Sequence, residues 1–88
     1  MYERRFEPRH RATEHVQVRW QDPAGKTVDL DGEVAEISQS GARLHLAKPI
    51  RVLTRVQVDR GEAHLKGKVR YCLPQNGRYS VGVEFDVH

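Results

Sequence analysis

The sequence has a single cysteine, a single tryptophan, few aromatic residues and no long apolar segment. Because Cys72 has no second cysteine to pair with, no disulfide can form within the chain, which is typical of a reducing compartment. No apolar run approaches the roughly 20 residues of a membrane-spanning helix. Charged residues also occupy the N-terminus, where a signal peptide would be apolar. We therefore predict a cytoplasmic protein that does not insert into a membrane.

Catalytic and metal-binding motifs are also missing. No serine, cysteine or carboxylate has the neighbours expected of a nucleophile and its base, and no phosphate-binding loop motif occurs. The lone cysteine cannot complete a zinc site, and no close metal-ligand spacing links the five histidines, which are His10, His15, His45, His64 and His88. We predict that the protein is not an enzyme and that it needs no metal or cofactor.

Length and charge limit the size of the fold and the kind of partner. Eighty-eight residues make one domain, residues 1–88, and a chain of this size buries somewhat over about 60% of its unfolded surface. Fifteen Lys and Arg against twelve Asp and Glu give a net charge of +3. This charge is too small for indiscriminate binding to a nucleic acid polymer, but it favours anionic partners locally. Four of the fifteen cationic residues lie in the first eleven positions, so the N-terminus is the most positive segment.

Alternation of apolar and polar residues predicts strands along most of the chain. The pair Asn76-Gly77 separates two alternating segments and is typical of a type I′ hairpin turn. An antiparallel arrangement in which the sheet closes on itself leaves no exposed edge. We therefore predict an all-β fold, a six-stranded antiparallel barrel over residues 14–86. The alternating segments are residues 15–20, 26–37, 42–46, 52–58, 63–71 and 79–85.

Several positions interrupt this alternation or fill its inner face. Gly32 lies in phase with inward apolar residues and predicts a bend or bulge. Ile37 directly follows Glu36 and breaks the phase, so we expect the strand to be distorted there. Pro74 is expected to end the fifth strand. We predict that His45 and His64 face solvent. Four aromatic residues share the inward phase and are predicted to lie in the core: Trp20, Tyr71, Tyr79 and Phe85.

The first thirteen residues have neither helical nor strand periodicity, and Pro8 disfavours a helix through the residue before it. We predict that residues 1–13 form a flexible, basic arm that binds a ligand through Arg4, Arg5 and Arg9. Arginine suits this role because its planar fork makes bidentate bonds to phosphate oxygens and its face stacks on a purine. The alternative is that the arm is only a solvated terminus.

A second motif, Glu36-Ile37-Ser38-Gln39-Ser40-Gly41, lies at the predicted turn between the second and third strands. A carboxylate only accepts hydrogen bonds, so Glu36 complements the two donors on the Watson–Crick edge of guanine and repels the acceptor N1 of adenine. Its alternative roles are exposure to water or an ion pair with an arm arginine. Ser38 binds a base or phosphate, or caps its own backbone. Gly41 is expected to adopt a positive φ first and to admit the ligand second.

The arm and the turn together resemble the PilZ domain, a bacterial receptor for cyclic di-GMP, in which an Arg-x-x-x-Arg arm precedes Asp/Asn-x-Ser-x-x-Gly. Here Arg5 and Arg9 match the arm. Glu36 stands where the family usually has Asp or Asn, and it is followed by the matching Ser38 and Gly41. The ending Tyr-Ser-Val-Gly-Val-Glu-Phe is similar to the family's last barrel strand. The resemblance therefore covers nearly the whole chain and implies a six-stranded barrel, often with a C-terminal helix. Almost nothing follows the last strand, so we expect little or no such helix.

The resemblance implies a sensor in which the arm closes over cyclic di-GMP and the resulting change of conformation signals to an effector protein of motility, exopolysaccharide or biofilm machinery. Arg4 is similar to the additional arginine of family members that take up a stacked pair of ligands. Glu36 supports a second hypothesis, a PilZ-like adaptor that does not bind cyclic di-GMP. A third hypothesis, RNA or single-stranded DNA binding through Lys66, Lys68 and Arg70, is disfavoured because the alternation places the aromatic residues inside.

Overall fold

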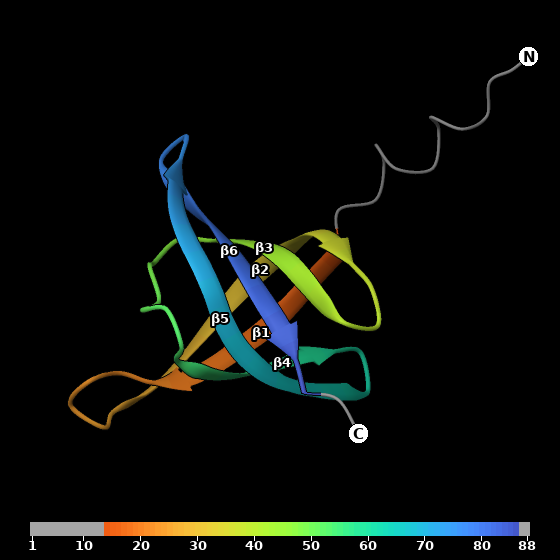
Figure 1. The fold of residues 1–88 in the computed structure, drawn as a ribbon, viewed down its shortest axis with the longest axis horizontal. Helices are drawn as coiled ribbons and strands as arrows, with labels where there is room; N and C mark the ends of the chain where they lie inside the picture. Colours follow the sequence, from red (N-terminus) through yellow and green to blue (C-terminus); the bar gives the residue numbers. More distant parts are fainter. Residues whose placement is uncertain (1–13, 87–88) are drawn as a thin grey trace, which may run out of the picture.

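The computed structural model describes residues 14–86, and these form six strands and no helix. The strands all pair antiparallel in the order β1-β2-β3-β6-β5-β4, and β4 pairs with β1 to close the barrel (Figure 1). This confirms the predicted all-β, six-stranded antiparallel barrel. The strands are β1 (Glu14–Gln21), β2 (Thr27–Ile37), β3 (Gly41–Leu46), β4 (Arg55–Arg60), β5 (Ala63–Gln75) and β6 (Arg78–Phe85).

The predicted arm, residues 1–13, with Arg4, Arg5 and Arg9, lies outside the described residues. Between residues 14 and 86 no helix follows β6, as expected. In the same part of the chain, no helix has the length and apolar character needed to cross a membrane.

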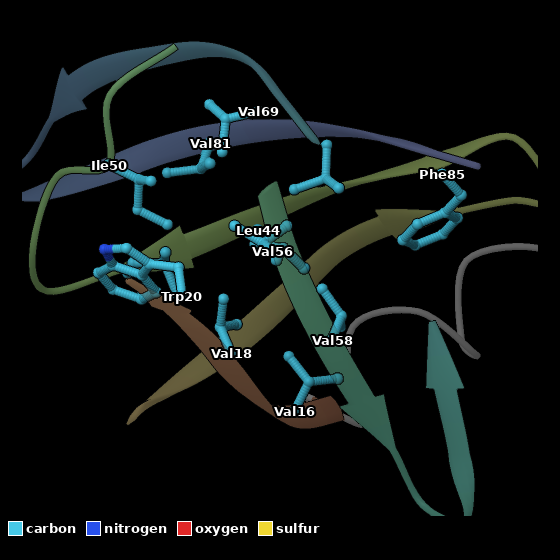
Figure 2. Close-up of a cluster of buried hydrophobic side chains, with 12 residues drawn as sticks. Val16, Val18, Trp20, Leu44, Ile50, Val56, Val58, Val69, Val81 and Phe85 are labelled. Carbon is cyan, nitrogen blue, oxygen red and sulfur yellow. The ribbon is translucent and has the colours of Figure 1, made fainter. Parts of the chain in front are cut away.

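The barrel interior is filled by aliphatic side chains and two aromatic rings, as Figure 2 shows. Strand β1 illustrates the alternation, because Val16, Val18 and Trp20 are buried while the residues between them are exposed. Trp20 and Phe85 are buried as predicted, and Tyr79 is partly buried and packs against the cluster. The buried cluster comprises Val16, Val18, Trp20, Leu44, Leu46, Ile50, Val56, Val58, Val69, Val81, Val83 and Phe85.

The distortion of β2 lies where the phase break predicts it and not at the glycine. The pairing of β2 with β3 shifts between Val34 and Glu36, a β-bulge that re-aims the strand end carrying the second motif. Gly32, by contrast, pairs in regular register with Val16 and Leu46, so no bulge occurs at this glycine. A Cβ at position 32 would lie 2.5 Å from Leu46 Cδ2, which shows that the leucine fills the missing side chain's place.

Two strand boundaries differ from the predicted ones by three or more residues. The fourth strand begins at Arg55, and the preceding segment with Val52 is a turn. Strand β5 continues through Pro74 to Gln75 instead of ending before the proline. Because β4 pairs only with Ala63–Lys68, the remainder of β5 has β6 as its one neighbouring strand, and a proline is tolerated at such an edge.

The hairpin between β5 and β6 has the predicted geometry, since Asn76 and Gly77 have φ values of 51° and 80°.

The histidines on β3 and β5 differ from one another. His64 is exposed, as predicted, and its Nδ1 lies 2.7 Å from Asp59 Oδ1. His45 is half-buried, and its Nε2 is buried without a hydrogen-bond partner among the described residues, so the prediction that it faces solvent is wrong.

Candidate ligand-binding site

The turn between β2 and β3 is closed by its own hydrogen bonds. The Ser38 amide donates to the Gly41 carbonyl at 2.8 Å, and the Ser40 amide donates to Ser38 Oγ at 3.3 Å. The Ser40 carbonyl in turn accepts a 2.9 Å bond from the amide of Phe85, which fastens the turn to the end of β6. Ser38 therefore stabilises the shape of the turn, as a serine commonly does, while its side chain stays exposed to solvent.

Gly41 is required by close packing and not by a left-handed backbone. Its φ is not among the positive values of the described glycines, which are those of Gly25, Gly61 and Gly77, so the predicted positive φ at Gly41 is wrong. A Cβ at position 41 would instead collide with the carbonyl oxygen of Val83 on β6. The glycine lets β3 begin directly against β6 and leaves bare backbone at the surface of the site.

Glu36 pairs with a neighbouring strand. Its Oε2 lies 3.1 Å from the guanidinium of Arg43, the residue opposite it on β3, and the Glu36 side chain is 73% exposed. An exposed ion pair of this kind contributes only about 0–1 kcal/mol, and a carboxylate has further lone pairs for other donors. Glu36 is thus held in position by Arg43 and can still accept hydrogen bonds from a ligand.

A hollow of about 510 Å³ lies on the outside of β2, β3, β6 and β5. It contains Glu36, Ser38 and Gly41 of the second motif, so the three predicted residues on the barrel line one concave surface. The strands bring further residues to this hollow, for which the sequence predicted no role in ligand binding. These are Arg43, Arg70, Tyr71 and Gly82.

Tyr71 lies outside the barrel, so its predicted place in the core is wrong. The pairing of β5 with β6 shifts between Val69 and Tyr71, and this bulge turns the tyrosine outward onto Gly82. A Cβ at Gly82 would overlap the Tyr71 ring, which shows how closely the ring lies over the glycine. Tyr71 is 37% exposed, so the hollow has an aromatic surface of the kind on which bases stack.

Two arginines make the hollow cationic beside the Glu36 carboxylate. Arg43 pairs with Glu36, and Arg70 donates to Glu84 Oε1 at 3.0 Å, with both partners of the latter pair about half exposed. Exposed ion pairs contribute little free energy, so Arg43 and Arg70 can leave their carboxylate partners for another anion at little cost. The alternation of β3 and β5 places Arg43 and Arg70 outward and was a usable signal for both, whereas Tyr71 reaches the hollow through a bulge that alternation does not reveal.

Strand β1 begins near this site. Glu14 pairs with Val34, two residues before Glu36, and is held to β4 by an ion pair with Arg60. Hydrogen bonding to Arg60 holds the pKa of the Glu14 carboxyl below its usual value. Figure 1 shows the start of β1 next to the end of β2. The N-terminal end of β1 therefore lies close to the second motif.

Comparison with known proteins agrees with the fold and the motifs. A family model described as the PilZ domain matches residues 3–88. No curated protein matches the chain. Because the family match covers essentially the whole sequence, the chain belongs to the PilZ domain family, a family of cyclic di-GMP receptors whose members are binding and adaptor domains and not enzymes.

Proposed function

We propose that this domain is a cyclic di-GMP sensor whose ligand binds in the hollow formed by the Glu36–Gly41 turn, Arg43, Arg70 and Tyr71. The observation that carries the proposal is the gathering of the PilZ turn motif, two guanidinium groups and an exposed aromatic ring on one concave surface. These are the groups that a cyclic dinucleotide requires, since it presents phosphates, base edges and base faces to its receptor.

The N-terminal arginines complete this site in the proposal. Arg5 and Arg9 bind phosphate oxygens and guanine faces, while Arg4 contacts a second, stacked ligand molecule. Arg9 and Glu14 are five positions apart in the sequence, which allows their Cα atoms to lie at most about 18 Å apart. Since Glu14 pairs with Val34 beside the motif, this length brings Arg9 within reach of the hollow.

Guanine is selected by the carboxylate of Glu36, which accepts from guanine N1–H and the N2 amine and repels the N1 acceptor of adenine. The guanidinium of Arg43, 3.1 Å from the Glu36 carboxylate, favours a position of Glu36 at the rim of the hollow. Isothermal titration with cyclic di-GMP tests the proposal, with cyclic di-AMP and GTP as controls. Heat from cyclic di-GMP alone is expected; no heat at tens of micromolar would favour the adaptor that lacks ligand binding.

The output of the sensor is a change of surface. Fixing the backbone of the N-terminal segment over the ligand costs roughly 1 to 2 kcal/mol per residue, and the charged contacts with the ligand must exceed this cost. The ordered segment then presents an effector protein, in motility, exopolysaccharide or biofilm machinery, with a surface that the free domain lacks.

Replacing Glu36 tests how the base is recognised. Glu36→Ala is expected to weaken cyclic di-GMP binding by about tenfold or more, because a hydrogen bond to a charged group contributes about 1.5 to 3 kcal/mol. Glu36→Asp is expected to bind more tightly than the parent, because it restores the shorter carboxylate that the family usually has. Both variants should keep the parent's melting temperature, since the Arg43 pair is exposed. An unchanged affinity in both titrations would mean that Glu36 faces solvent.

Replacing Tyr71 tests the aromatic surface. Tyr71→Ala is expected to weaken binding between about fivefold and about 150-fold, because base–aromatic stacking contributes about 1 to 3 kcal/mol. Tyr71→Phe is the matched control: it keeps the ring over Gly82 and is expected to bind within about twofold of the parent. Equal affinities for the alanine and phenylalanine variants, measured by titration calorimetry, would show that the ring does not contact a base.

A further inference from the structure

The β1–β2 hairpin and the segment that joins β3 to β4 lie on the side of the barrel away from the Glu36–Gly41 turn (Figure 1). A second concave surface lies between them. Its volume is about 560 Å³, and it shares no residue with the hollow described above. We call it the Leu53 groove and define it by Trp20, Lys48, Ile50, Arg51, Val52 and Leu53.

Two adjacent apolar side chains line this groove while remaining largely exposed. Val52 is 54% and Leu53 63% accessible to solvent. Burial in the barrel therefore does not explain why apolar residues occupy these positions. Trp20 and Ile50 lie beneath them as part of the buried core, so the groove has an apolar floor as well as an apolar wall.

The backbone at Leu53 is in the left-handed region, with a φ of 76°. Leucine disfavours this conformation, which glycine and asparagine adopt readily. It is fixed by hydrogen bonds to β5, since the Leu53 amide donates to the Val69 carbonyl at 2.7 Å and the Val69 amide donates to the Thr54 carbonyl at 3.0 Å. A strained residue that displays an apolar side chain to solvent is an observation from which a binding role can be inferred.

The charge around the Leu53 groove is positive. Lys48 and Arg51 line it, and Lys66 lines a neighbouring hollow that shares Trp20 with it. Arg19 and Arg55 also line the neighbouring hollow, but they form ion pairs with Asp29 and Asp86. Within residues 14–86, no ion pair involves Lys48, Arg51 or Lys66.

The one carboxylate that lines these two hollows is already engaged. Asp22 Oδ1 accepts hydrogen bonds from the amides of Ala24 and Lys26, each at 2.9 Å, and so closes the β1–β2 turn. The cations of the Leu53 groove therefore complement an acidic partner.

We propose that the Leu53 groove binds an acidic segment of a partner protein, which places an apolar side chain against Val52 and Leu53 while its carboxylates pair with Lys48 and Arg51. A nucleic acid fits less well, because the groove's aromatic residue, Trp20, is only 7% exposed and offers no face for base stacking. A membrane surface also fits less well, because the exposed apolar residues line a concavity instead of projecting from it.

The test uses the full chain without any cyclic dinucleotide, so its result does not depend on the proposed function. The probe is a short synthetic peptide of glutamates that carries two leucines. One control peptide replaces the leucines with serine, and another replaces the glutamates with lysine. Binding is followed by amide chemical shifts and by the fluorescence of Trp20, the only tryptophan in the chain. We expect the leucine–glutamate peptide alone to shift the Leu53 groove residues and to change the Trp20 emission.

Leu53→Asn separates binding from folding. Asparagine tolerates the left-handed backbone, so this variant is expected to melt at the parent's temperature or above it while binding the peptide at least tenfold more weakly. The matched control is Leu73→Asn, because Leu73 is a similarly exposed leucine, at 56%, outside the groove. The control variant is expected to bind like the parent.

Four results would overturn the proposal. One is equal binding by Leu53→Asn and the parent, and another is equal binding of the serine control peptide. The third is a change in the chemical shifts or Trp20 fluorescence of the Leu53 groove that phosphatidylserine vesicles or polyuridylate produce and the acidic peptide does not. The fourth is a concentration-dependent dimer that Leu53→Asn abolishes, which would make a second copy of the chain the occupant.

Discussion

Arg9→Ala is expected to weaken cyclic di-GMP binding by one to two powers of ten. The guanidinium of Arg9 makes charge-assisted hydrogen bonds to a phosphate in the proposed complex, and each such bond contributes about 1.5 to 3 kcal/mol. Arg9→Lys is expected to recover only part of the lost affinity, because a lysine keeps the charge but neither the bidentate fork nor the stacking face. Titration calorimetry of the three proteins at one salt concentration measures the effect.

Arg11→Ala is the matched control for this experiment. It removes the same charge from the same segment, but it lies outside the Arg-x-x-x-Arg motif. If Arg9 binds the ligand at a defined place, the Arg11 variant should stay within about threefold of the parent, because only a general electrostatic contribution is lost. Similar losses in the Arg9 and Arg11 variants would mean that the N-terminal charge attracts the ligand without binding it specifically.

Gly41→Ala is expected to destabilise the barrel severely, whereas Gly82→Ala is expected to impair the site and leave the barrel almost intact. At position 41 the added methyl would collide with a backbone carbonyl of β6, which cannot move without breaking the β3–β6 pairing. Overpacking commonly costs about 1 to 3 kcal/mol, and in a domain of this size each kcal/mol lowers the melting temperature by about 4–8 °C. We expect a loss of at least about 10 °C for Gly41→Ala.

At position 82 the added methyl would meet the Tyr71 ring, a side chain at the surface that is able to swing into solvent. The expected loss in melting temperature is therefore only a few degrees, about that of a 1 kcal/mol change. The displaced ring no longer lies in the hollow, so cyclic di-GMP affinity should fall as in Tyr71→Ala. Equal losses of stability in the two glycine variants, by thermal unfolding, would contradict the difference between backbone and side-chain collisions.

The barrel was predictable from the sequence because alternation reports directly on which face of a strand is buried. The series Val16, Val18 and Trp20 and the hairpin at Asn76-Gly77 both had the predicted structure. The phase break at Glu36-Ile37 likewise located the bulge in β2. Each of these signals lies within a few consecutive residues, which is why it can be recognised without knowledge of the partner strand.

Features that depend on a partner strand could not be predicted in the same way. The residues around the bulge in β5 carry no local sequence signal for it. The one extra residue in a bulge reverses the face on which the following side chains lie. Tyr71 therefore lies at the site and not in the predicted core. The absence of a side chain at Gly82 explains where the ring lies, but only once β5 and β6 are paired. Gly32 and Gly41 were misread for the same reason, because the groups that exclude their side chains belong to neighbouring strands.

The candidate site was predicted in part. Glu36, Ser38 and Gly41 were found through the spacing of the motif, and the structure places all three on one hollow. The roles of Arg4, Arg5 and Arg9 stay predictions, because these residues lie outside the described part of the chain. The ion pair between Glu36 and Arg43 was not anticipated, although the outward phase of Arg43 on β3 was visible in the sequence.

A titration of the isotope-labelled full chain with cyclic di-GMP, followed by NMR, would show whether the N-terminal arginines and the Glu36–Gly41 turn bind the ligand together. We predict saturable shifts at Arg5, Arg9, the turn and Tyr71, with none of them produced by cyclic di-AMP. A saturable response that leaves either the arginines or the turn unchanged, or no response at all, would contradict the proposed site.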